Sequence, residues 1–235
     1  MQDLHFIQIQ ILKKLLFSPK LRYSDLRPEN VENNLLNFHL NQLKDLSLIQ
    51  KEDEMYSLTL KGKEFAGRMD TDKLHIQKQA KISAWIAAIN DQNKEIEYLV
   101  YTRLKHPFYG CQGFLSGKVE YGESVVDAAK RELSEECGLI GEPSILQVKH
   151  YLVRAKESGE LLEDKFMFQC LIKNPTGELR QSDEGKYEWV KESRLNDYVT
   201  NHFENWERFE EEVRFIKEFN GTTRIIEETY YSDKF

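Results

Sequence analysis

No stretch of this 235-residue sequence is apolar for long enough to cross a bilayer, which excludes a helical membrane protein. The first apolar run, residues 4–17, contains two lysines and no small-residue cleavage site, so we do not expect a secretion signal. Cysteine is scarce, and its three positions are odd in number and far apart: Cys111, Cys137 and Cys170. Such cysteines are typical of reduced core thiols rather than of a disulfide framework. These absences predict a cytoplasmic protein with no membrane partner.

The chain also lacks the excess of basic residues that a nucleic-acid partner would attract. It has 33 Lys and Arg against 40 Asp and Glu, a net charge of -7. Hydrophobic residues make up 40% and charged residues 31%, which is typical of a globular protein. The length allows one large domain, or a medium domain with a small one, and the second arrangement fits the chain better.

What the sequence does contain, in residues 117–139, is a fixed spacing of glycines, one arginine and carboxylates. The pattern is G-x5-E-x7-R-E-U-x-E-E-x-G-U, where U is aliphatic. Every specified position is filled, by Gly117, Glu123, Arg131, Glu132, Leu133, Glu135, Glu136, Gly138 and Leu139. Ser124 with Asp127 is a helix-capping pattern, and Gly138 suits the left-handed residue beyond a helix end. We therefore expect a helix over residues 125–137.

The acidic residues of this helix form a cluster. Offsets of three and four place Glu132 beside Glu135 and Glu136, and three like charges repel unless a cation neutralises them. Magnesium prefers such oxygen ligands. The alternative is a solvated acidic face, the usual interpretation of an acidic run taken alone. The glycine-rich segment 117–122 directly before the helix favours a metal site, because glycine lets the backbone approach a metal or an anion closely.

The pattern resembles the signature of the Nudix hydrolases, which cleave nucleoside diphosphates linked to another group and use Mg²⁺ or Mn²⁺. The resemblance implies that Glu132 and Glu136 bind the metal directly. It also implies that Glu135 contributes directly or through water, and that the carbonyl of Gly117 joins them. Arg131 would brace the loop by pairing with Glu123.

The resemblance further implies Mg²⁺-dependent attack of water on one phosphorus of a nucleoside diphosphate derivative. In the family, the base for that water lies on the signature helix or in a later loop. Glu184 is our candidate, with Glu188 and Glu120 as rivals, and Glu135 counts among the catalytic candidates. Arg103 and Lys118 are candidates for binding the substrate, although a surface salt bridge is the alternative for Arg103.

Residues 1–70 have the order of a winged helix, with three helices and then a hairpin, and they resemble bacterial winged-helix domains more loosely. The third helix should begin after Pro28, with a core face made of Val31, Leu35, Phe38, Leu43 and Leu46. Its opposite face carries the candidate DNA-binding residues Asn33, Asn37, Asn41 and Lys44. Ten basic and ten acidic residues balance in this region, which disfavours DNA.

Residues 71–80 are polar and are expected to link this domain to a second one, residues 81–235. Strands, one helix, more strands and further helices predict an α/β fold, and the resembled family implies an α/β/α sandwich with a mixed sheet. A late helix is expected over residues 201–219. Beyond it, Ile225, Ile226, Tyr230 and Tyr231 fit either a sheet edge or another subunit, which leaves a homodimer open.

Two functions therefore remain. The first is a Nudix-type pyrophosphohydrolase, which we favour because every position of the signature is filled. The second is a regulator that senses a nucleotide metabolite and binds DNA through the winged helix.

Overall fold

The computed structural model describes residues 4–72, 74–76 and 78–235. The chain forms two compact units, Met1–Lys78 and Gln79–Phe235. Residues 73 and 77 of the predicted linker lie outside the described residues. Among the described residues, no helix is both long and apolar enough to span a membrane.

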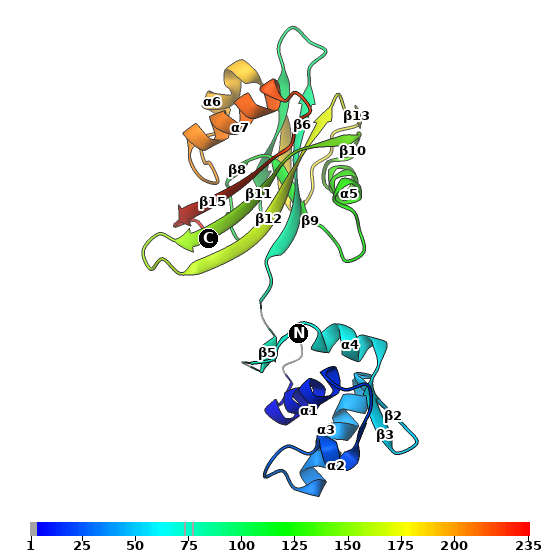
Figure 1. Ribbon diagram of the computed structural model, residues 1–235. Helices are drawn as coiled ribbons and strands as arrows, with labels where there is room; N and C mark the ends of the chain where they lie inside the picture. The colour runs from blue at the N-terminus through cyan, green and yellow to red at the C-terminus, as the bar shows by residue number, and fades with distance from the viewer. Residues whose placement is uncertain (1–3, 73, 77) are drawn as a thin grey trace. The chain divides into compact units, whose positions relative to one another are not determined.

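The first unit is mainly helical, with a small three-stranded sheet of order β1-β3-β2 (Figure 1). Its elements are α1 Phe6–Leu16, β1 Leu21–Arg22, α2 Tyr23–Leu26, α3 Asn33–Asp45, β2 Ile49–Glu52, β3 Met55–Leu58, α4 Leu60–Ala66, β4 Met69–Asp70 and β5 His75–Ile76. Helices followed by a β2–β3 hairpin match the predicted order of elements. The assignment to the winged-helix class stays a prediction.

The expected core face of α3 is wrong at two of its positions. Leu43 is buried as expected, and Val31 and Leu46 pack against the core beside the helix. Leu35 and Phe38, however, are 44% and 54% exposed, and Leu36 and Leu40 are buried in their place. Both sets have helical spacing, so periodicity alone does not choose between them. The side chains that pack against α1 and the hairpin decide which face is buried.

The second unit is built on a mixed eight-stranded sheet with the order β14-β7-β6-β12-β11-β15, to which β8 and β9 add at β7 and β6. Its strands are β6 Lys81–Asn90, β7 Glu97–Arg103, β8 Gln112–Gly113, β9 Leu115–Lys118, β11 Pro143–Ala155, β12 Leu161–Lys173, β14 Gly185–Lys191 and β15 Arg224–Ser232. The β6–β12 and β11–β15 pairs are parallel and the others antiparallel. A separate short pair joins β10 Leu139–Ile140 to β13 Thr176–Gly177.

Helices cover both faces of this sheet, as the predicted sandwich requires (Figure 1). Helix α5, Val125–Cys137, packs on one face with Ala84 and Ile86 of β6. Helices α6, Leu195–Tyr198, and α7, Trp206–Glu218, lie on the other face, where Trp85 and Ala87 point. A short 3-10 turn, Glu192–Arg194, precedes α6.

Two expectations for the C-terminal region have different outcomes. Helix α7 begins at Trp206 rather than near residue 201, because the Asn205 side chain accepts a hydrogen bond from the Arg208 amide at 2.9 Å and caps the helix there. The last segment forms β15, which pairs with β11 at the sheet edge, one of the two alternatives left open by the sequence.

We predict that Gly62→Ala destabilises the first unit selectively. A Cβ atom at Gly62 would overlap the backbone carbonyl of Leu48, which cannot move as a side chain can. Overpacking of this kind costs about 1–3 kcal/mol in the free energy of unfolding. Denaturant unfolding with site-specific probes in each unit should detect the loss in the first unit. The exposed neighbour, Lys63→Ala, is the control, and equal stability of both variants would contradict the prediction.

Candidate active site

Helix α5 is fixed at both ends by its own sequence. The Ser124 hydroxyl accepts a hydrogen bond from the Asp127 amide at 3.1 Å, and Gly138 adopts a left-handed φ of 74° beyond the last turn. Ala129, Leu133 and Cys137 are fully buried against the sheet. Burial of this stripe leaves the glutamates of the helix on its other sides, as the spacing predicted.

Arg131 is the hub of the acidic cluster. Its Nε and Nη2 atoms donate to the two oxygens of Glu123 at 2.8 and 3.0 Å, a bidentate pair. Nη1 donates to Glu132 at 3.0 Å and to Glu135 at 3.1 Å. Nη2 also donates to the Lys118 carbonyl at 3.0 Å. One guanidinium therefore ties the loop before α5 to three carboxylates.

Gly117 makes room for Glu132. A Cβ atom on Gly117 would fall far inside van der Waals contact with the carboxyl group of Glu132. The Glu132 side chain is only 12% exposed. Only glycine at position 117 lets this carboxylate lie against strand β9, beside a backbone carbonyl.

Glu136 is held from the opposite direction. The hydroxyl of Tyr187, on β14, donates a short hydrogen bond to Glu136. The Tyr187 ring stacks on Tyr101 with centroids 5.5 Å apart, and the residue is 3% exposed. Tyr187 therefore fixes the position of Glu136 from a different element of the sheet.

The pKa values in the cluster follow burial and charge. The hydrogen bonds from Arg131 lower the pKa of Glu123, while the same pairing raises that of Arg131. Burial raises the pKa of Glu132, with a further contribution from the nearby Glu136 carboxylate. Burial and the Glu136 carboxylate raise the pKa of Tyr187, so this hydroxyl stays protonated as a donor.

The donor set fits a hard divalent cation. Three carboxylates, from Glu132, Glu135 and Glu136, lie on one helix, and Gly117 forms a cradle beside them. In the part of the chain that the structure describes, no three His, Cys, Asp or Glu side chains already converge in metal-binding geometry. Arg131 donates hydrogen bonds to one oxygen each of Glu132 and Glu135, and Tyr187 to one oxygen of Glu136.

The cluster opens into a cleft of about 880 Å³ that is lined from both sides of the sheet. Glu132, Glu135 and Glu136 line it from α5, and Phe209 and Glu212 line it from α7. Strands β9 and β7 pair with different parts of β6: β9 with its first half and β7 with its end. Residues of both β7 and β9 line the cleft.

The cationic candidates lie in the same cleft. The guanidinium of Arg103 donates to the Pro107 carbonyl, in the loop that follows β7, at 2.6 Å and to the hydroxyl of Tyr101, on β7 itself, at 3.2 Å. Lys118 also lines the cleft and is exposed. The structure thus brings both predicted substrate-binding residues to the carboxylate cluster.

The three candidate bases differ in position. Glu184 lines the cleft and forms an ion pair with Lys105, both side chains being about half exposed. Glu120 also lines the cleft, in the loop before α5. Glu188 is exposed, accepts a hydrogen bond from Tyr198 at 3.0 Å, and is absent from the described lining.

Sequence reasoning missed two residues of this site. Tyr187 lies within the segment that supplied Glu184, but nothing in the spacing indicated that its hydroxyl reaches α5. Lys105 follows Arg103 by two residues and lines the cleft, where burial lowers its pKa. The sequence offered one indication of this role, because Lys105 lies just beyond the end of an expected strand, in a loop where binding residues are often found.

The candidate DNA-binding residues belong to the first unit. Asn33, Asn37, Asn41 and Lys44 are all exposed on α3. The side chain of Asn33 accepts a hydrogen bond from Arg27 at 3.3 Å.

Comparison with known proteins identifies similar chains. The family model described as the NUDIX domain matches residues 80–213, more than half of the chain. An ADP-ribose pyrophosphatase of Methanocaldococcus jannaschii is 26% identical over 133 residues, covering 57% of this chain and 76% of that protein. An uncharacterized Nudix hydrolase of Bacillus subtilis is 35% identical over 88 residues, covering 37% of this chain and 54% of that protein.

Solved structures include the NUDIX domain of Shewanella oneidensis NrtR in complex with ADP ribose. It is 13% identical, with a TM-score of 0.49, and the match covers 64% of this chain and 96% of that domain.

We predict that Gly117→Ala weakens divalent-cation binding, because the added methyl group displaces the Glu132 carboxylate. Loss of a supporting contact at a metal site typically costs about 10–100-fold in affinity. Titration of Mn²⁺ followed by electron paramagnetic resonance should give a Kd raised by at least about tenfold. The adjacent Ser116→Ala is the matched control. An unchanged Kd in Gly117→Ala, with Mn²⁺ bound by both variants, would contradict the proposed role of this cradle.

Proposed function

This chain belongs to the NUDIX family, and from that premise we propose that it hydrolyses the diphosphate linkage of a nucleoside diphosphate derivative with Mg²⁺, or Mn²⁺, bound at α5. As a Nudix-type pyrophosphohydrolase it acts on acid anhydrides of phosphorus. The observation that carries the proposal is the Arg131-centred cluster, in which Arg131 pairs with Glu123, Glu132 and Glu135. Arg131, Glu132, Glu135 and Glu136 line the 880 Å³ cleft. The M. jannaschii relative makes ADP-ribose the first substrate to test.

Glu132 and Glu136 would hold the cation, with Glu135 and the Gly117 carbonyl as further oxygen donors. When bound, the cation would offset negative charge on the phosphate oxygens during attack by water. Arg131 orients Glu132 and Glu135 and does not itself react. One edge of its guanidinium, formed by Nε and Nη2, holds both oxygens of Glu123. Tyr187 would keep one oxygen of Glu136 oriented while the other turns to the cation.

The chain's own cations would bind the diphosphate. Arg103 is anchored by backbone carbonyls rather than by a carboxylate, so its charge remains available to an anion. Lys105 is 41% exposed and can leave Glu184 for a substrate phosphate. That exchange would release the Glu184 carboxylate beside the cleft, where it can accept a proton from water.

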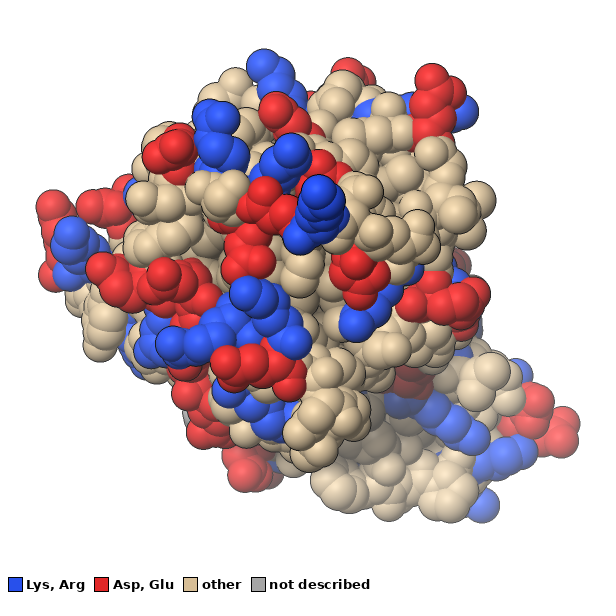
Figure 2. Space-filling model, turned by 90° about the horizontal axis from the view of Figure 1, so that it is seen from above, with Lys and Arg blue, Asp and Glu red and all other residues tan. Residues whose placement is uncertain are grey.

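The other candidate function, a DNA-binding regulator, depends on the first unit. Its helix α3 presents exposed asparagines. Acidic and basic residues are equal in number over residues 1–70, however, so this region has no net positive charge. For the chain as a whole, 33 basic residues stand against 40 acidic ones, and Figure 2 shows acidic and basic side chains interspersed on the face in view. A nucleic-acid surface should be predominantly basic.

For this reason we expect no specific DNA complex. A gel-shift at low salt with mixed duplexes should give no retarded band at micromolar protein, because too few cations are available to displace counterions. A salt-sensitive band that is lost in Asn37→Ala, but not in the control Lys63→Ala, would favour the regulator instead.

We predict that Glu136→Gln abolishes Mg²⁺-dependent turnover and leaves the fold intact. Loss of one charged ligand removes several kcal/mol of charge stabilisation, so kcat/KM should fall by roughly a hundredfold or more. The measurement uses ADP-ribose, other nucleotide sugars, nucleoside triphosphates and dinucleotides, with release of phosphate or nucleotide followed in Mg²⁺ and in EDTA.

Glu142→Gln is the control for this variant, because Glu142 is 86% exposed and forms an ion pair with Lys130, away from the cleft lining of the described residues. Unaltered turnover in Glu136→Gln would remove Glu136 from the site. Failure of the wild-type protein to hydrolyse any of these diphosphates in Mg²⁺ would refute the proposed function.

A further inference from the structure

The mixed sheet of the second unit ends in two edge strands, β14 and β15, whose exposed side chains differ in charge. The exposed residues of β14 are all charged and are Lys186, Glu188 and Lys191. Charged side chains on an edge strand oppose its pairing with another chain. A single charged residue occurs among the exposed residues of β15, which are Ile225, Glu227, Thr229 and Tyr231. One edge of the sheet is therefore protected by charge, whereas the other is not.

Strand β15 is joined to the rest of the unit along its whole length. Its nine residues pair with β11 in one continuous register. The Tyr230 hydroxyl donates a hydrogen bond to the Phe203 carbonyl. The Arg224 guanidinium lies over the Phe215 ring, 3.7 Å from its centroid. In the described part of the chain, no strand pairs with the outer edge of β15 (Figure 1). A long, regular edge of this kind presents unpaired backbone donors and acceptors to a further strand.

The side chains of β15 alternate between the two faces of the sheet. Its even-numbered residues point to the α7 face, where Glu228 lies 3.2 Å from Arg208 of α7. Its odd-numbered residues point to the opposite face, where Ile225 and Tyr231 are 77% and 56% exposed. Exposed apolar residues taken singly need no explanation. The spacing of these residues along the strand, however, is informative.

The sequence of β15 is nearly symmetric about Glu228. Two isoleucines lie three and two positions before it, and two tyrosines lie three and two positions after it: Ile225, Ile226, Tyr231 and Tyr230. An antiparallel pair of two β15 strands centred on Glu228 would therefore place Ile225 opposite the partner's Tyr231. It would likewise place Ile226 opposite the partner's Tyr230. Pairs of a β-branched and an aromatic side chain stabilise neighbouring strands, and each face of this pair would gain two of them.

The charge of Glu227 favours this register over its neighbours. Residues directly opposite each other in an antiparallel pair point to the same face, so a symmetric pair must be centred on a residue. With Glu228 at the centre, Glu227 lies opposite the partner's Thr229, whose hydroxyl can donate to the carboxylate. With Glu227 at the centre, the two Glu227 carboxylates would lie opposite each other and repel. With Thr229 at the centre, neither isoleucine would lie opposite a tyrosine.

The carboxylate at the centre of the pair has cations of its own. The two Glu228 side chains would approach each other on the α7 face. Within each chain, Glu228 lies 2.9 Å from Lys149 and 3.2 Å from Arg208. Burial acts to lower the pKa of Lys149, but the surrounding carboxylates outweigh it and raise that pKa, so the lysine stays charged. These ion pairs reduce the repulsion between the two carboxylates.

We propose that the outer edge of β15 pairs with the same edge of a second copy of this chain, antiparallel and centred on Glu228. The two sheets then join into one across a homodimer interface. Such an interface is isologous, because each copy contributes the same strand. Ile225 and Tyr231 are not among the described residues that line the cleft, so the inference does not depend on the proposed function.

The register is tested by disulfide formation in the full-length double variant Ile225→Cys/Tyr231→Cys, oxidised mildly and followed by non-reducing gel electrophoresis. We expect a dimer band that a reducing agent removes, because each new thiol faces the other new thiol of the partner. The two positions are about 20 Å apart along one strand, too far for a disulfide within a chain. The two single variants are the controls and should form no dimer band. The native cysteines are buried and do not compete.

The interface is tested by analytical ultracentrifugation of the full-length protein at micromolar concentration. Wild-type protein should have twice the mass of one chain. Ile225→Lys/Tyr231→Lys removes the exposed apolar pairs and places like charges opposite each other, so the dimer Kd should rise by at least about tenfold. Ile225→Lys/Tyr231→Glu places opposite charges there instead, and should dimerise at least about threefold more tightly than the double-lysine variant.

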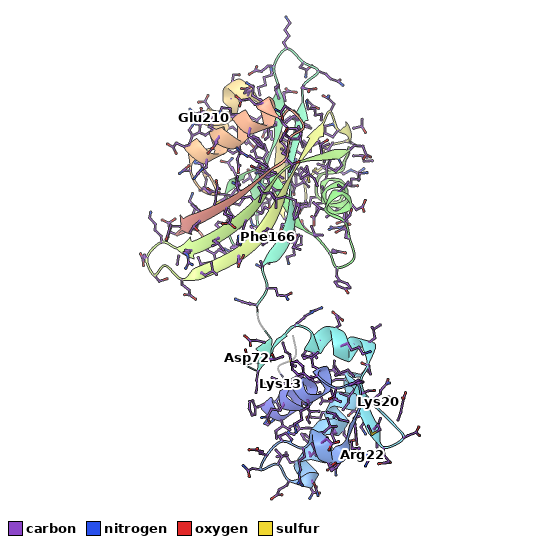
Figure 3. The ribbon with its side chains drawn as sticks, in the orientation of Figure 1. Lys13, Lys20, Arg22, Asp72, Phe166 and Glu210 are labelled. Carbon is purple, nitrogen blue, oxygen red and sulfur yellow. The ribbon has the colours of Figure 1, made fainter. Side chains whose placement is uncertain are left out.

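Phe166→Lys is the matched control, because Phe166 is 37% exposed on the same face of the sheet but belongs to the interior strand β12 (Figure 3). This variant should keep the wild-type dimer Kd within about threefold. Thermal unfolding identifies a variant that fails to fold, and the disulfide test stays decisive if the double-lysine variant is unstable. A monomeric wild-type protein would overturn the proposal. So would a dimer that Phe166→Lys disrupts and the folded double-lysine variant does not, or single cysteine variants that cross-link as well as the double variant.

Discussion

The bidentate pair between Arg131 and Glu123 is the interaction on which the site depends. Three carboxylates on one helical face repel one another, and the guanidinium compensates that repulsion while it anchors the preceding loop. The planar fork of arginine matches a carboxylate in two places, which a lysine ammonium cannot do. Gly117 then admits Glu132 against β9, and Tyr187 restrains Glu136 from β14.

The mixed sheet gives this cluster a cleft that residues from both helical layers line. Helix α5 brings Glu132, Glu135 and Glu136 to it from one face, and α7 brings Phe209 and Glu212 from the other. Lys149 of β11 forms ion pairs with Glu212 of α7 and with Glu228 of β15, so these pairs join α7 to the strands at this side of the sheet.

The sequence predicted the parts of the molecule that depend on local rules. The signature, the Ser124 cap and Gly138 together define α5, and strand patterns with one intervening helix predicted the α/β fold. The sequence predicted that Leu43 of α3 is buried. It did not reveal that Leu36 and Leu40 are buried with it instead of Leu35 and Phe38, because both pairs fit helical spacing. It overextended α7, since the capping role of Asn205 depends on the local backbone. Tyr187, Lys105 and the Lys149 ion pairs depend on contacts between distant segments, which spacing along the chain does not encode.

The central claim is that α5 and Gly117 exist to bind a divalent cation against a diphosphate. The most direct measurement is a crystal structure of the protein grown in Mn²⁺, with anomalous scattering used to locate the metal. We expect an anomalous peak coordinated by Glu132 and Glu136, with the Gly117 carbonyl within coordination distance. Ordered carboxylates that remain bound to Arg131 and Tyr187, with no peak between them at saturating Mn²⁺, would contradict the account.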